Sequence, residues 1–352
     1  IMGVLNLMAI LREHAPSSIN QVTPTQLAGK HIAIDASVSM YQFLATTQQD
    51  TLAMVRGLFL RAVNLIENGI TPVYVFDGKP PDIKTETLAR RELRRKKAAD
   101  QIAASANGPD HEEEAIRLAR QTMKVTAEHV KACKELFDLM GVAYVQAPEE
   151  AEAQCVELVK SGRCYAVGSE DSDVLPFGGA ILLKSLTFCS GKTHATQVNL
   201  REVLNKLNLG RSELIDLCIL LGCDYCDTIK NVGQVTAFQL LKQYRSIEKA
   251  ITHINQVKSP LPSGYMERVR KARDYFSRPP VKKGGELRLQ ASAPQKDALI
   301  HHLTQKLGMK LGQANERVGS LVKYSIVTEE TVARPATVPA SKSVPAHNGG
   351  EC

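Results

Sequence analysis

The chain has 352 residues, of which 43% are hydrophobic, so it has enough apolar material for a buried core and is not disordered throughout. Tryptophan is absent and aromatic residues make up only 5%, which argues against recognition by stacked aromatic platforms. The formal net charge of +7 is compatible with a polyanionic partner but does not identify one. At about 150 residues per domain, the length suggests two units or one large α/β domain with insertions.

Eight cysteines occur, several of them inside apolar runs, as is typical of small buried residues. No pattern typical of a secretory signal is seen, which favours a reducing intracellular setting. Cys223 and Cys226 form a Cys-x-x-Cys pair, but no second pair follows, so the spacing does not favour a zinc ribbon. No run of about 18 apolar residues is present, so we expect no transmembrane helix and no membrane partner.

The first third of the chain alternates strand and helix patterns. Residues 31–37 (HIAIDAS) are predicted to form a buried strand that ends in an acid, and residues 71–78 (TPVYVFDG) a second one. Between them, residues 51–69 have helical spacing and end at Gly69, a common C-terminal cap. This strand–helix–strand order predicts a parallel sheet covered by helices on both faces.

A densely basic segment then interrupts the pattern. Residues 84–100 are rich in lysine and arginine and are followed by a polar stretch and an acidic run, so we expect a helical insertion that projects from the α/β body. Lys84 and Arg91 are seven apart, and on a helix they would present two cations to one phosphate. The alternative is that the segment is simply a solvated basic helix. The segment follows Asp77 directly, which would place Lys84 close to the acids, and this favours a role in phosphate binding.

The α/β pattern resumes after this insertion. Residues 125–141 are predicted to be helical, and Pro148 suits the first position of the next helix. Residues 164–173 are predicted to form a strand that runs into acids, followed by another strand and an apolar helix. We expect short helices over residues 233–325 and a disordered tail from about residue 331, where core-forming periodicity is missing.

Acids stand at the ends of the predicted strands or at the starts of the elements that follow them. Because ligands of parallel sheets bind at the carboxyl ends of the strands, we expect these acids to gather in one crevice. A single acid in such a position is usually a helix cap or a turn residue, but this explanation does not account for the whole set. The seven acids are Asp35, Asp77, Glu150, Glu152, Asp171, Asp173 and Asp224.

This set of acids indicates a site for divalent metal ions. Neighbouring carboxylates repel one another, and hard divalent cations, which prefer oxygen ligands, remove the repulsion. Two such ions roughly 3.5–4 Å apart can activate a water and stabilise the leaving oxygen of a phosphodiester. Glu150 and Glu152 pose a difficulty, since residues i and i+2 of a regular helix do not face each other. They share a site only if they lie at the first turn or serve different ions.

Five motifs, in this order, resemble those of flap endonucleases, which belong to the XPG-type superfamily of structure-specific 5′-nucleases. They are IAIDAS with the nearby Tyr41-Gln-Phe-Leu, VYVFDGKPP, APEEAEAQC, SEDSD and DLCILLGCDY. The resemblance spans roughly residues 2 to 330. It implies an α/β fold of the PIN or 5′-nuclease type, with a central, mostly parallel sheet flanked by helices. A helical arch and a C-terminal helix–two-turn–helix region that binds DNA are also implied.

The resemblance divides the chain into five regions. The N-terminal nuclease region, with the start of the arch, is expected over residues 2–103, and the rest of the arch over 104–130. The internal nuclease region is expected over 131–223. The helix–two-turn–helix and the C-terminal helical region are expected over 224–330, and a disordered tail over 331–352.

The resemblance also implies roles for individual residues. The first metal ion would be held by Asp35, Asp77, Glu150 and Glu152. The second would be held by Asp171, Asp173 and Asp224, with Glu152 close to both ions. Lys84 and Arg91 match the gateway residues that contact the scissile phosphate, and with Asp173 they are the expected catalytic residues. DNA contacts are expected from Gly3, Tyr41, Arg61, Lys84, Arg91, Glu150, Gly222, Asp224, Thr228 and Gly233.

The implied activity is that of a 5′-flap endonuclease with 5′-3′ exonuclease activity, which acts by a two-metal-ion mechanism on flaps, nicks and gaps. The implied cofactors are two Mg²⁺ ions per subunit, for which Mn²⁺ can substitute, and a K⁺ ion bound at the helix–two-turn–helix with the Thr228 hydroxyl. The family acts in Okazaki-fragment maturation and base-excision repair. We therefore expect a monomer located in the nucleus, with mitochondria as a second location.

Two internal segments depart from the family pattern. The duplex-binding turn, usually Gly-Ile-Gly-Pro, is Asn231-Val232-Gly233-Gln234 here; Asn231 tolerates a positive φ, so we expect the turn to persist while K⁺ affinity is in question. The segment between Phe43 and Gly57 is short and has Gln48 where the family often has arginine, so recognition of a 3′ flap is expected to differ.

The two ends of the chain also depart from the pattern. The sliding clamp is a partner in the family, but its binding motif, Gln-x-x-Leu-x-x-Phe-Phe, does not occur after residue 325. We therefore do not expect clamp binding by the usual route. Ile1 precedes Met2, whereas the family exposes an N-terminal glycine near the site, so an extra residue could crowd it.

Two alternative functions stay open. A related nuclease that cuts bubbles or four-way junctions would share these motifs, although the short insertion between the two nuclease halves does not favour the long-insert repair type. A non-catalytic protein that binds branched DNA would have a decayed site, whereas all seven acids and both gateway cations are present here. A panel of flap, bubble and junction substrates with Mg²⁺ separates the three.

Overall fold

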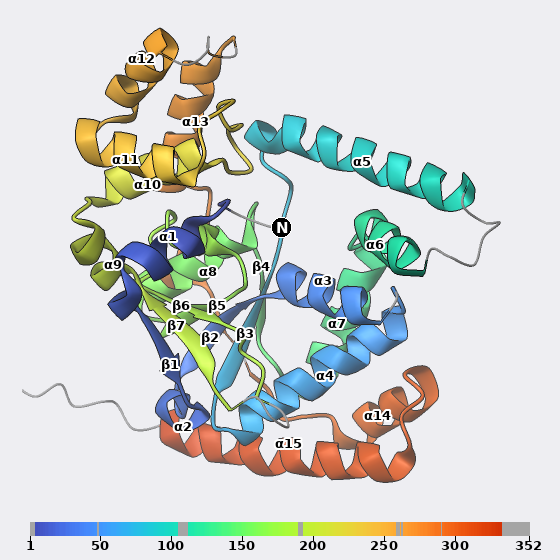
Figure 1. The fold of residues 1–352 in the computed structure, drawn as a ribbon. Helices are drawn as coiled ribbons and strands as arrows, with labels where there is room; N and C mark the ends of the chain where they lie inside the picture. The colour runs from blue at the N-terminus through green and yellow to red at the C-terminus, as the bar shows by residue number, and fades with distance from the viewer. Residues whose placement is uncertain are drawn as a thin grey trace, which may run out of the picture.

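A seven-stranded mixed sheet forms the centre of the computed structural model, which describes residues 4–47, 49–104, 112–188, 193–257, 261, 263–289 and 291–332 (Figure 1). The strands are β1 (Ile19–Val22), β2 (His31–Asp35), β3 (Thr71–Phe76), β4 (Tyr144–Gln146), β5 (Ala166–Gly168), β6 (Ile181–Lys184) and β7 (Ala195–Asn199). Their order across the sheet is β1-β7-β6-β5-β2-β3-β4. Strand β2 pairs in parallel with both β3 and β5, so the carboxyl ends of the central strands share one edge.

The predicted parallel sheet is confirmed for β2 to β6, while β7 pairs antiparallel with both β6 and β1. Successive side chains of a strand point to opposite faces of the sheet, which explains how both faces of this sheet are buried. In β3, Tyr74 and Phe76 point into one core, whereas Val73 and Val75 point into the other. Each face therefore requires its own layer of helices, and the fold is a sheet between two helical layers.

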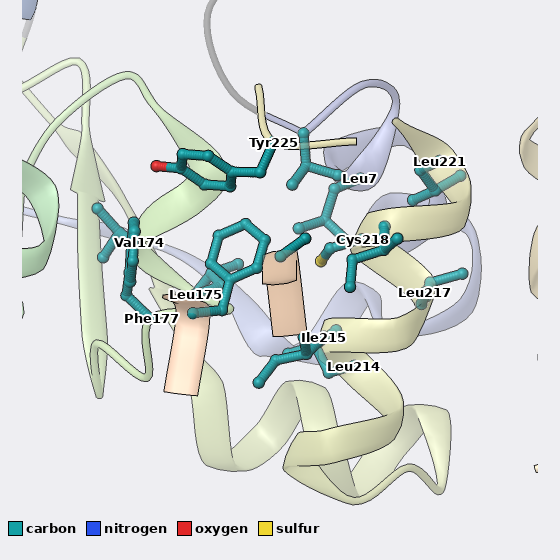
Figure 2. Close-up of a cluster of buried hydrophobic side chains, with 14 of the residues drawn as sticks. Leu7, Val174, Leu175, Phe177, Leu214, Ile215, Leu217, Cys218, Leu221 and Tyr225 are labelled. Carbon is teal, nitrogen blue, oxygen red and sulfur yellow. The ribbon is translucent and has the colours of Figure 1, made fainter. Parts of the chain in front are cut away.

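One layer contains α3 (Ala36–Thr46), α4 (Thr51–Glu67), α7 (Ala127–Met140), α14 (Lys296–His301) and α15 (Leu311–Val332). The other contains α1 (Leu7–His14), α8 (Ala151–Lys160), α9 (Leu200–Leu207), α10 (Arg211–Leu221), α11 (Gln234–Tyr244), α12 (Ile247–Val257) and α13 (Tyr265–Ser277). Within the second layer, Phe177 packs among side chains of α1, α10 and the segment around Tyr225 (Figure 2). Short helices α2 (Pro24–Leu27) and η1 (Pro16–Ser18) connect the first elements.

The basic insertion is helical, as predicted, and forms α5 (Thr85–Ala104) and α6 (Glu112–Thr122), which pack on each other away from the sheet (Figure 1). The prediction that Lys84 lies on the same helix as Arg91 is wrong. Lys84 ends a 3₁₀ turn, η2 (Asp82–Lys84), that runs directly into α5. Pro81 caps this turn with an extended backbone, and the regular helix begins after Lys84.

The expectation of only short helices over residues 233–325 is also wrong. Helices α11 to α13 are short, but α15 has 22 residues. Its length follows from packing, because Ala314, Val318 and Leu321 recur at helical spacing. They form one apolar stripe of the helix, which is buried in the same core as α3 and α4. Disorder was expected over residues 331–352, but residues 331 and 332 belong to α15, and residues 333–352 lie outside the described residues. Among the helices that the structure describes, none is both long and apolar enough to cross a membrane.

Candidate active site

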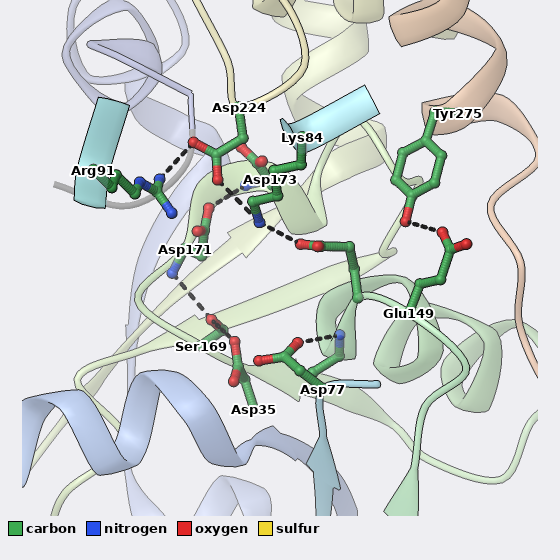
Figure 3. Close-up of polar contacts among 12 residues, drawn as sticks. Asp35, Asp77, Lys84, Arg91, Glu149, Ser169, Asp171, Asp173, Asp224 and Tyr275 are labelled. Atoms are coloured by element: carbon green, nitrogen blue, oxygen red, sulfur yellow. Dashed lines mark hydrogen bonds and ion pairs between the residues drawn. The ribbon is translucent and has the colours of Figure 1, made fainter. Parts of the chain in front are cut away.

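Two of the seven acids follow the central strands β2 and β3. Asp35 ends β2 and caps α3, where its Oδ1 accepts a hydrogen bond from the Val38 amide at 3.0 Å. Asp77 follows β3, and its Oδ1 accepts a hydrogen bond from the Ala151 amide at 2.8 Å (Figure 3). Asp77 therefore ties the end of a strand to the first residue of α8, which brings a third acidic segment to this edge of the sheet.

Glu150 and Glu152 lie at the start of α8. Glu150 is the N-cap residue, with an extended backbone (φ −74°, ψ 131°), and Glu152 belongs to the first helical turn. Because Glu150 precedes the first helical residue, the rule that residues i and i+2 diverge does not apply to this pair. Of the two arrangements that the sequence left open, the structure has the pair at the first turn.

Asp171 and Asp173 lie at the start of the short helix η3 (Ser172–Val174), just after β5. Asp171 caps it and accepts a hydrogen bond from the Asp173 amide at 2.8 Å. Ser169 connects this turn to Asp35, because its Oγ accepts from the Asp171 amide at 3.0 Å and lies 3.4 Å from Asp35 Oδ2. Asp173 Oδ1 in turn accepts from the Val4 amide at 2.6 Å, so the N-terminal segment contacts the acids.

Asp224 lies in the turn that follows α10. Cys223 and Cys226 flank it and exchange two backbone hydrogen bonds, of 3.2 and 3.4 Å. Gly222 precedes the turn at φ 95°, and a Cβ there would overlap the Thr228 side chain. The close approach of Thr228 to the backbone at Gly222 therefore requires a glycine. This turn places Asp224 opposite the basic residues at the start of the helical arch, which consists of α5 and α6.

Lys84 and Arg91 converge on the acids, as predicted, although only Arg91 lies on α5. The Lys84 Nζ atom lies 2.7 Å from Glu150 Oε2 and 3.0 Å from Asp224 Oδ2. The guanidinium of Arg91 lies 2.6 Å from Asp224 Oδ1 (Figure 3). The Lys84 side chain is only 13% exposed, so this ion pairing takes place in a largely desolvated site.

Burial and mutual repulsion dominate the electrostatics of the acids. Burial, followed by the neighbouring Asp77, raises the pKa of Asp35 well above its usual range. Burial and then Asp35 do the same to the pKa of Glu152, and burial and then Asp171 raise the pKa of Asp173. Asp224 differs: burial raises its pKa, but Lys84 and Arg91 outweigh burial and leave it lowered.

This donor set fits divalent metal ions in its chemistry. Carboxylates whose ionised form is disfavoured by burial and by one another need positive charge, and Lys84 and Arg91 contact only Glu150 and Asp224 among them. Among the residues that the structure describes, no three His, Cys, Asp or Glu side chains already form a group that could hold one ion. The acids therefore lie at one edge of the sheet, but no three of them are arranged as the ligands of a single ion.

The other predicted DNA contacts are spread over the molecule. Tyr41 is partly exposed on α3, and Arg61 lies on α4, where its guanidinium covers the Phe43 ring at 4.4 Å. Thr228 is exposed near Gly222, and Gly233 caps α11. Gly3 lies outside the described residues, as do Ile1, Met2 and Gln48, so the expectations for these four have no structural counterpart here.

The expected left-handed residue in the duplex-binding turn is confirmed, since Asn231 has φ 62°. Between Phe43 and Gly57, α3 ends at Thr46 and α4 begins at Thr51. That this segment is shorter than in the family stays a prediction.

Three contacts at the site were not predicted from the sequence. The Val4 amide and the Ser169 hydroxyl were missed because a backbone donor and a lone serine carry no signal for long-range pairing. Tyr275, on α13, donates a hydrogen bond from its hydroxyl to Glu149 Oε2 at 2.8 Å. Burial, followed by Glu150 and the bond to Glu149, raises the pKa of Tyr275, so the hydroxyl stays protonated.

Family models match both halves of this site. The XPG N-terminal domain matches residues 2–98, and the XPG I-region matches residues 141–224. The first region contains Asp35, Asp77 and both gateway cations, and the second contains the other five acids. The two arch helices, α5 and α6, begin in the first region and continue into the segment between the two matches.

Curated relatives and solved structures agree with this match. The chain is 40% identical to flap endonuclease 1 of Nematostella vectensis over 92% of its own length and 88% of the relative, and 39% identical to that of Danio rerio over 86% and 82%. The flap endonuclease-1 structure from Methanococcus jannaschii has a TM-score of 0.67 at 28% identity, covering 88% of this chain and 96% of that one. The catalytic core of Rad2 in complex with DNA substrate has a TM-score of 0.69 at 26% identity, covering 91% and 100%.

The fold and the site together define a nuclease of the XPG type, an enzyme that acts on phosphodiester bonds. The chain belongs to the flap endonuclease family. Nucleases of this family use divalent metal ions.

Proposed function

We propose that this chain cuts DNA where a 5′ flap meets a duplex, and that it also removes nucleotides from 5′ ends. The observation that carries the proposal is the convergence of seven carboxylates at one edge of the sheet, directly against two cations at the base of a helical arch. The flap substrate is supported by relatives named flap endonuclease 1, about 40% identical over most of the chain. By the same relationship we propose roles in DNA replication and base-excision repair in the nucleus.

Two divalent ions complete the site in this proposal, with Mg²⁺ as the natural ion and Mn²⁺ as its substitute. The residues that would hold the first are Asp35, Asp77, Glu150 and Glu152, and those that would hold the second are Asp171, Asp173 and Asp224, with Glu152 close to both. When bound, the ions would activate the attacking water and stabilise the leaving oxygen. Their positive charge would also offset the repulsion that raises the pKa of Asp35 and Asp173.

Lys84 and Arg91 would bind the scissile phosphate. In the absence of DNA both pair with carboxylates, Lys84 with Glu150 and Asp224, and Arg91 with Asp224. A phosphate offers these cations the same kind of anionic oxygen, and a bidentate contact suits the guanidinium. Because the site is largely desolvated, charge that develops on the phosphate would be stabilised more strongly here than in water.

The remaining DNA contacts are proposed to position the substrate. Tyr41 would stack near the cut, and Arg61 would contact the DNA backbone. The turn from Thr228 to Gly233 would hold the duplex, with K⁺ bound near the exposed Thr228 hydroxyl. The left-handed backbone at Asn231 supports this turn, because it preserves the conformation that a glycine would otherwise supply.

A substrate panel tests the proposal. Double-flap, bubble, four-way-junction and plain duplex DNA of matched sequence are each incubated with the protein and Mg²⁺. We expect the flap to be cut at its base faster than the other substrates. Preferred cutting of the bubble or junction would assign the chain to a related specificity, and binding of the flap without cutting in Mg²⁺ or Mn²⁺ would reject the nuclease assignment for this chain.

A further inference from the structure

Tyr275 contacts the acid site from a helix that carries none of the seven acids. Its hydroxyl donates a hydrogen bond to Glu149 Oε2 at 2.8 Å, and Glu149 immediately precedes Glu150 in the chain (Figure 3). Both side chains are only partly exposed, so the bond is shielded from bulk water. A hydrogen bond to a charged acceptor is stronger than one between neutral groups. The contact therefore joins α13 to the residue next to a proposed metal ligand.

Backbone hydrogen bonds hold Pro148 and Glu149 against the end of β3. The Gly78 amide donates to the Glu149 carbonyl at 2.6 Å, and the Lys79 amide donates to the Pro148 carbonyl at 3.0 Å. The start of α8 is held separately, by the Ala151 amide on Asp77 Oδ1 and by Lys84 on Glu150 Oε2. None of these bonds holds the Glu149 side chain, which the Tyr275 hydroxyl contacts. Glu150 is the N-cap of α8, and its carbonyl accepts from the Gln154 amide at 3.3 Å. A shift of Glu149 would therefore be passed on to Glu150 and to the first turn of α8.

The ring of Tyr275 contacts two further acid-bearing segments. It lies 4.8 Å from the ring of Tyr225, the neighbour of Asp224 in the chain. It also meets the ring of Phe177 edge-on at 6.0 Å, and the Phe177 amide donates to the Asp173 carbonyl at 3.1 Å. One side chain of α13 thus touches the segments of Glu150, Asp224 and Asp173.

We propose that Tyr275 is a positioning residue for the carboxylate site, which acts through its hydrogen bond to Glu149 and thereby sets the orientation of Glu150 and Glu152. This inference rests on the proposed function, because it assigns Glu150 and Glu152 to metal binding. It concerns the hydroxyl rather than the ring: the ring fills the core between three segments, whereas the hydroxyl has a directed bond to Glu149.

The competing explanation is that Tyr275 only fills space, and Tyr275→Phe separates the two because it removes the hydroxyl and keeps the ring. Glu149→Ala removes the acceptor, and Glu149→Gln keeps a carbonyl oxygen that the hydroxyl can still reach. Tyr265→Phe is the matched control, since Tyr265 is buried at the start of the same helix and its hydroxyl faces the Cys226 side chain instead.

The first measurement is divalent-ion binding without DNA, by titration calorimetry with Mn²⁺ and with Mg²⁺. We expect Tyr275→Phe and Glu149→Ala each to weaken ion binding by about 3- to 10-fold, the scale of one ordinary hydrogen bond. Glu149→Gln should stay close to the wild type, and Tyr265→Phe should equal it. The double variant Tyr275→Phe/Glu149→Ala should be no weaker than the weaker single variant, because both changes break the same bond.

Two further readouts separate positioning from general loss of structure. In the metal-free protein, amide hydrogen exchange over residues 147–155 should be faster in Tyr275→Phe than in Tyr265→Phe, at similar melting temperatures. In flap cleavage, the Mg²⁺ concentration for half-maximal rate should rise while KM for DNA changes by less than about twofold.

The proposal is overturned if Tyr275→Phe binds ions like the wild type, or if Tyr275→Phe and Tyr265→Phe lose ion affinity and melting temperature to the same extent. Its failure differs from failure of the proposed function: a wild-type protein that does not cut flaps would reject the function, whereas the ion-binding and exchange comparisons need no cleavage.

Discussion

The Lys84 Nζ atom lies 2.7 Å from Oε2 of Glu150, although the two residues are 66 positions apart in the chain. The contact joins the base of the arch to the start of α8 and pairs a proposed phosphate ligand with a proposed metal ligand. An ion bound by Glu150 and a phosphate bound by Lys84 would each compete with this contact. In our account, metal and substrate therefore replace this ion pair together.

Replacing Lys84 by methionine is expected to lower kcat on flap DNA by about 10²-fold, the usual effect of removing one electrostatic group that stabilises a transition state. The metal-free protein should also melt at a lower temperature, because Glu150 and Asp224 lose a buried counter-ion. Added Mg²⁺ should restore much of that melting temperature. Cleavage rates and melting curves with and without Mg²⁺ check both effects.

Lys79→Met is the matched control for Lys84→Met. Lys79 lies five residues earlier, its side chain is 83% exposed, and its contact with Asp82 spans 3.9 Å. It should change neither rate nor stability measurably. Equal effects of the two substitutions would contradict the role given to Lys84.

Asp35→Asn is expected to stabilise the metal-free protein while it abolishes cleavage. Burial and Asp77 raise the pKa of Asp35, so the folded state favours its protonated form. Such a group contributes stability that is fully present below its unfolded pKa, about 3.9, and is lost as pH rises through the folded value. Above the folded pKa, the ionised carboxylate lowers the stability of the folded state. A neutral asparagine side chain at this position would avoid that cost. We expect a melting temperature about 2–4 °C higher near pH 7.5 in EDTA.

The pH dependence provides the check. The melting-temperature advantage of Asp35→Asn should shrink as pH falls toward the range where Asp35 is protonated, because the two proteins then carry the same charge at this position. Asparagine retains an oxygen that can accept from the Val38 amide, so the cap of α3 is kept. A variant that melts below the wild type at neutral pH would show that repulsion among the acids is not the dominant effect.

Gly78→Ala is expected to reduce both stability and cleavage. A Cβ at Gly78 would overlap the carbonyl oxygens of Ala147 and Pro148, which are backbone atoms and cannot move aside easily. The strand end at Asp77 and the segment before Glu150 would have to separate. We expect a loss of about 1–3 kcal/mol in the free energy of unfolding, measured by urea titration. Gly285→Ala, where a Cβ meets open space, should stay near the wild type, and an equal loss there would contradict this explanation.

Arg273→Leu is expected to destabilise the fold without a specific effect on metal binding. Arg273, on α13, forms two hydrogen bonds with Asp216 on α10, at 2.8 and 2.9 Å, and the Asp216 side chain is only 6% exposed. Removing one partner of a buried pair leaves an uncompensated charge and costs about 3 kcal/mol. Arg270→Leu, on the exposed face of the same helix, should cost far less. Similar unfolding curves for the two variants would contradict this role.

Local patterns were sufficient to predict the sheet and the convergence of the acids. Strands β2 and β3 are short apolar runs that end at Asp35 and Asp77, and parallel strands bring such ends together. The arch was also predictable, because a polar, basic segment cannot be buried in the core. The 3₁₀ turn that separates Lys84 from α5 was missed, because the local sequence does not distinguish it from the first turn of the helix.

Long-range pairing explains what could not be predicted. The bond from the Val4 amide to Asp173 joins residues 169 apart, and that between Tyr275 and Glu149 joins residues 126 apart. Neither leaves a trace in the local sequence, because each depends on how helices pack in three dimensions. The 22-residue α15 was missed for a similar reason, since its apolar stripe is sparse and is stabilised by the core residues against which it packs.

The most direct test of the central claim is cleavage of a 5′-labelled double-flap DNA by the wild-type protein and by Asp173→Ala, each with Mg²⁺ and with EDTA. Asp173 is 4% exposed and lies between Asp171 and the Val4 amide, so its carboxylate belongs to the acid site. We predict one short product from the flap base, formed only by the wild type and only with Mg²⁺. Full activity of Asp173→Ala in Mg²⁺ would contradict the two-ion assignment, and undiminished cutting in EDTA would contradict the metal site altogether.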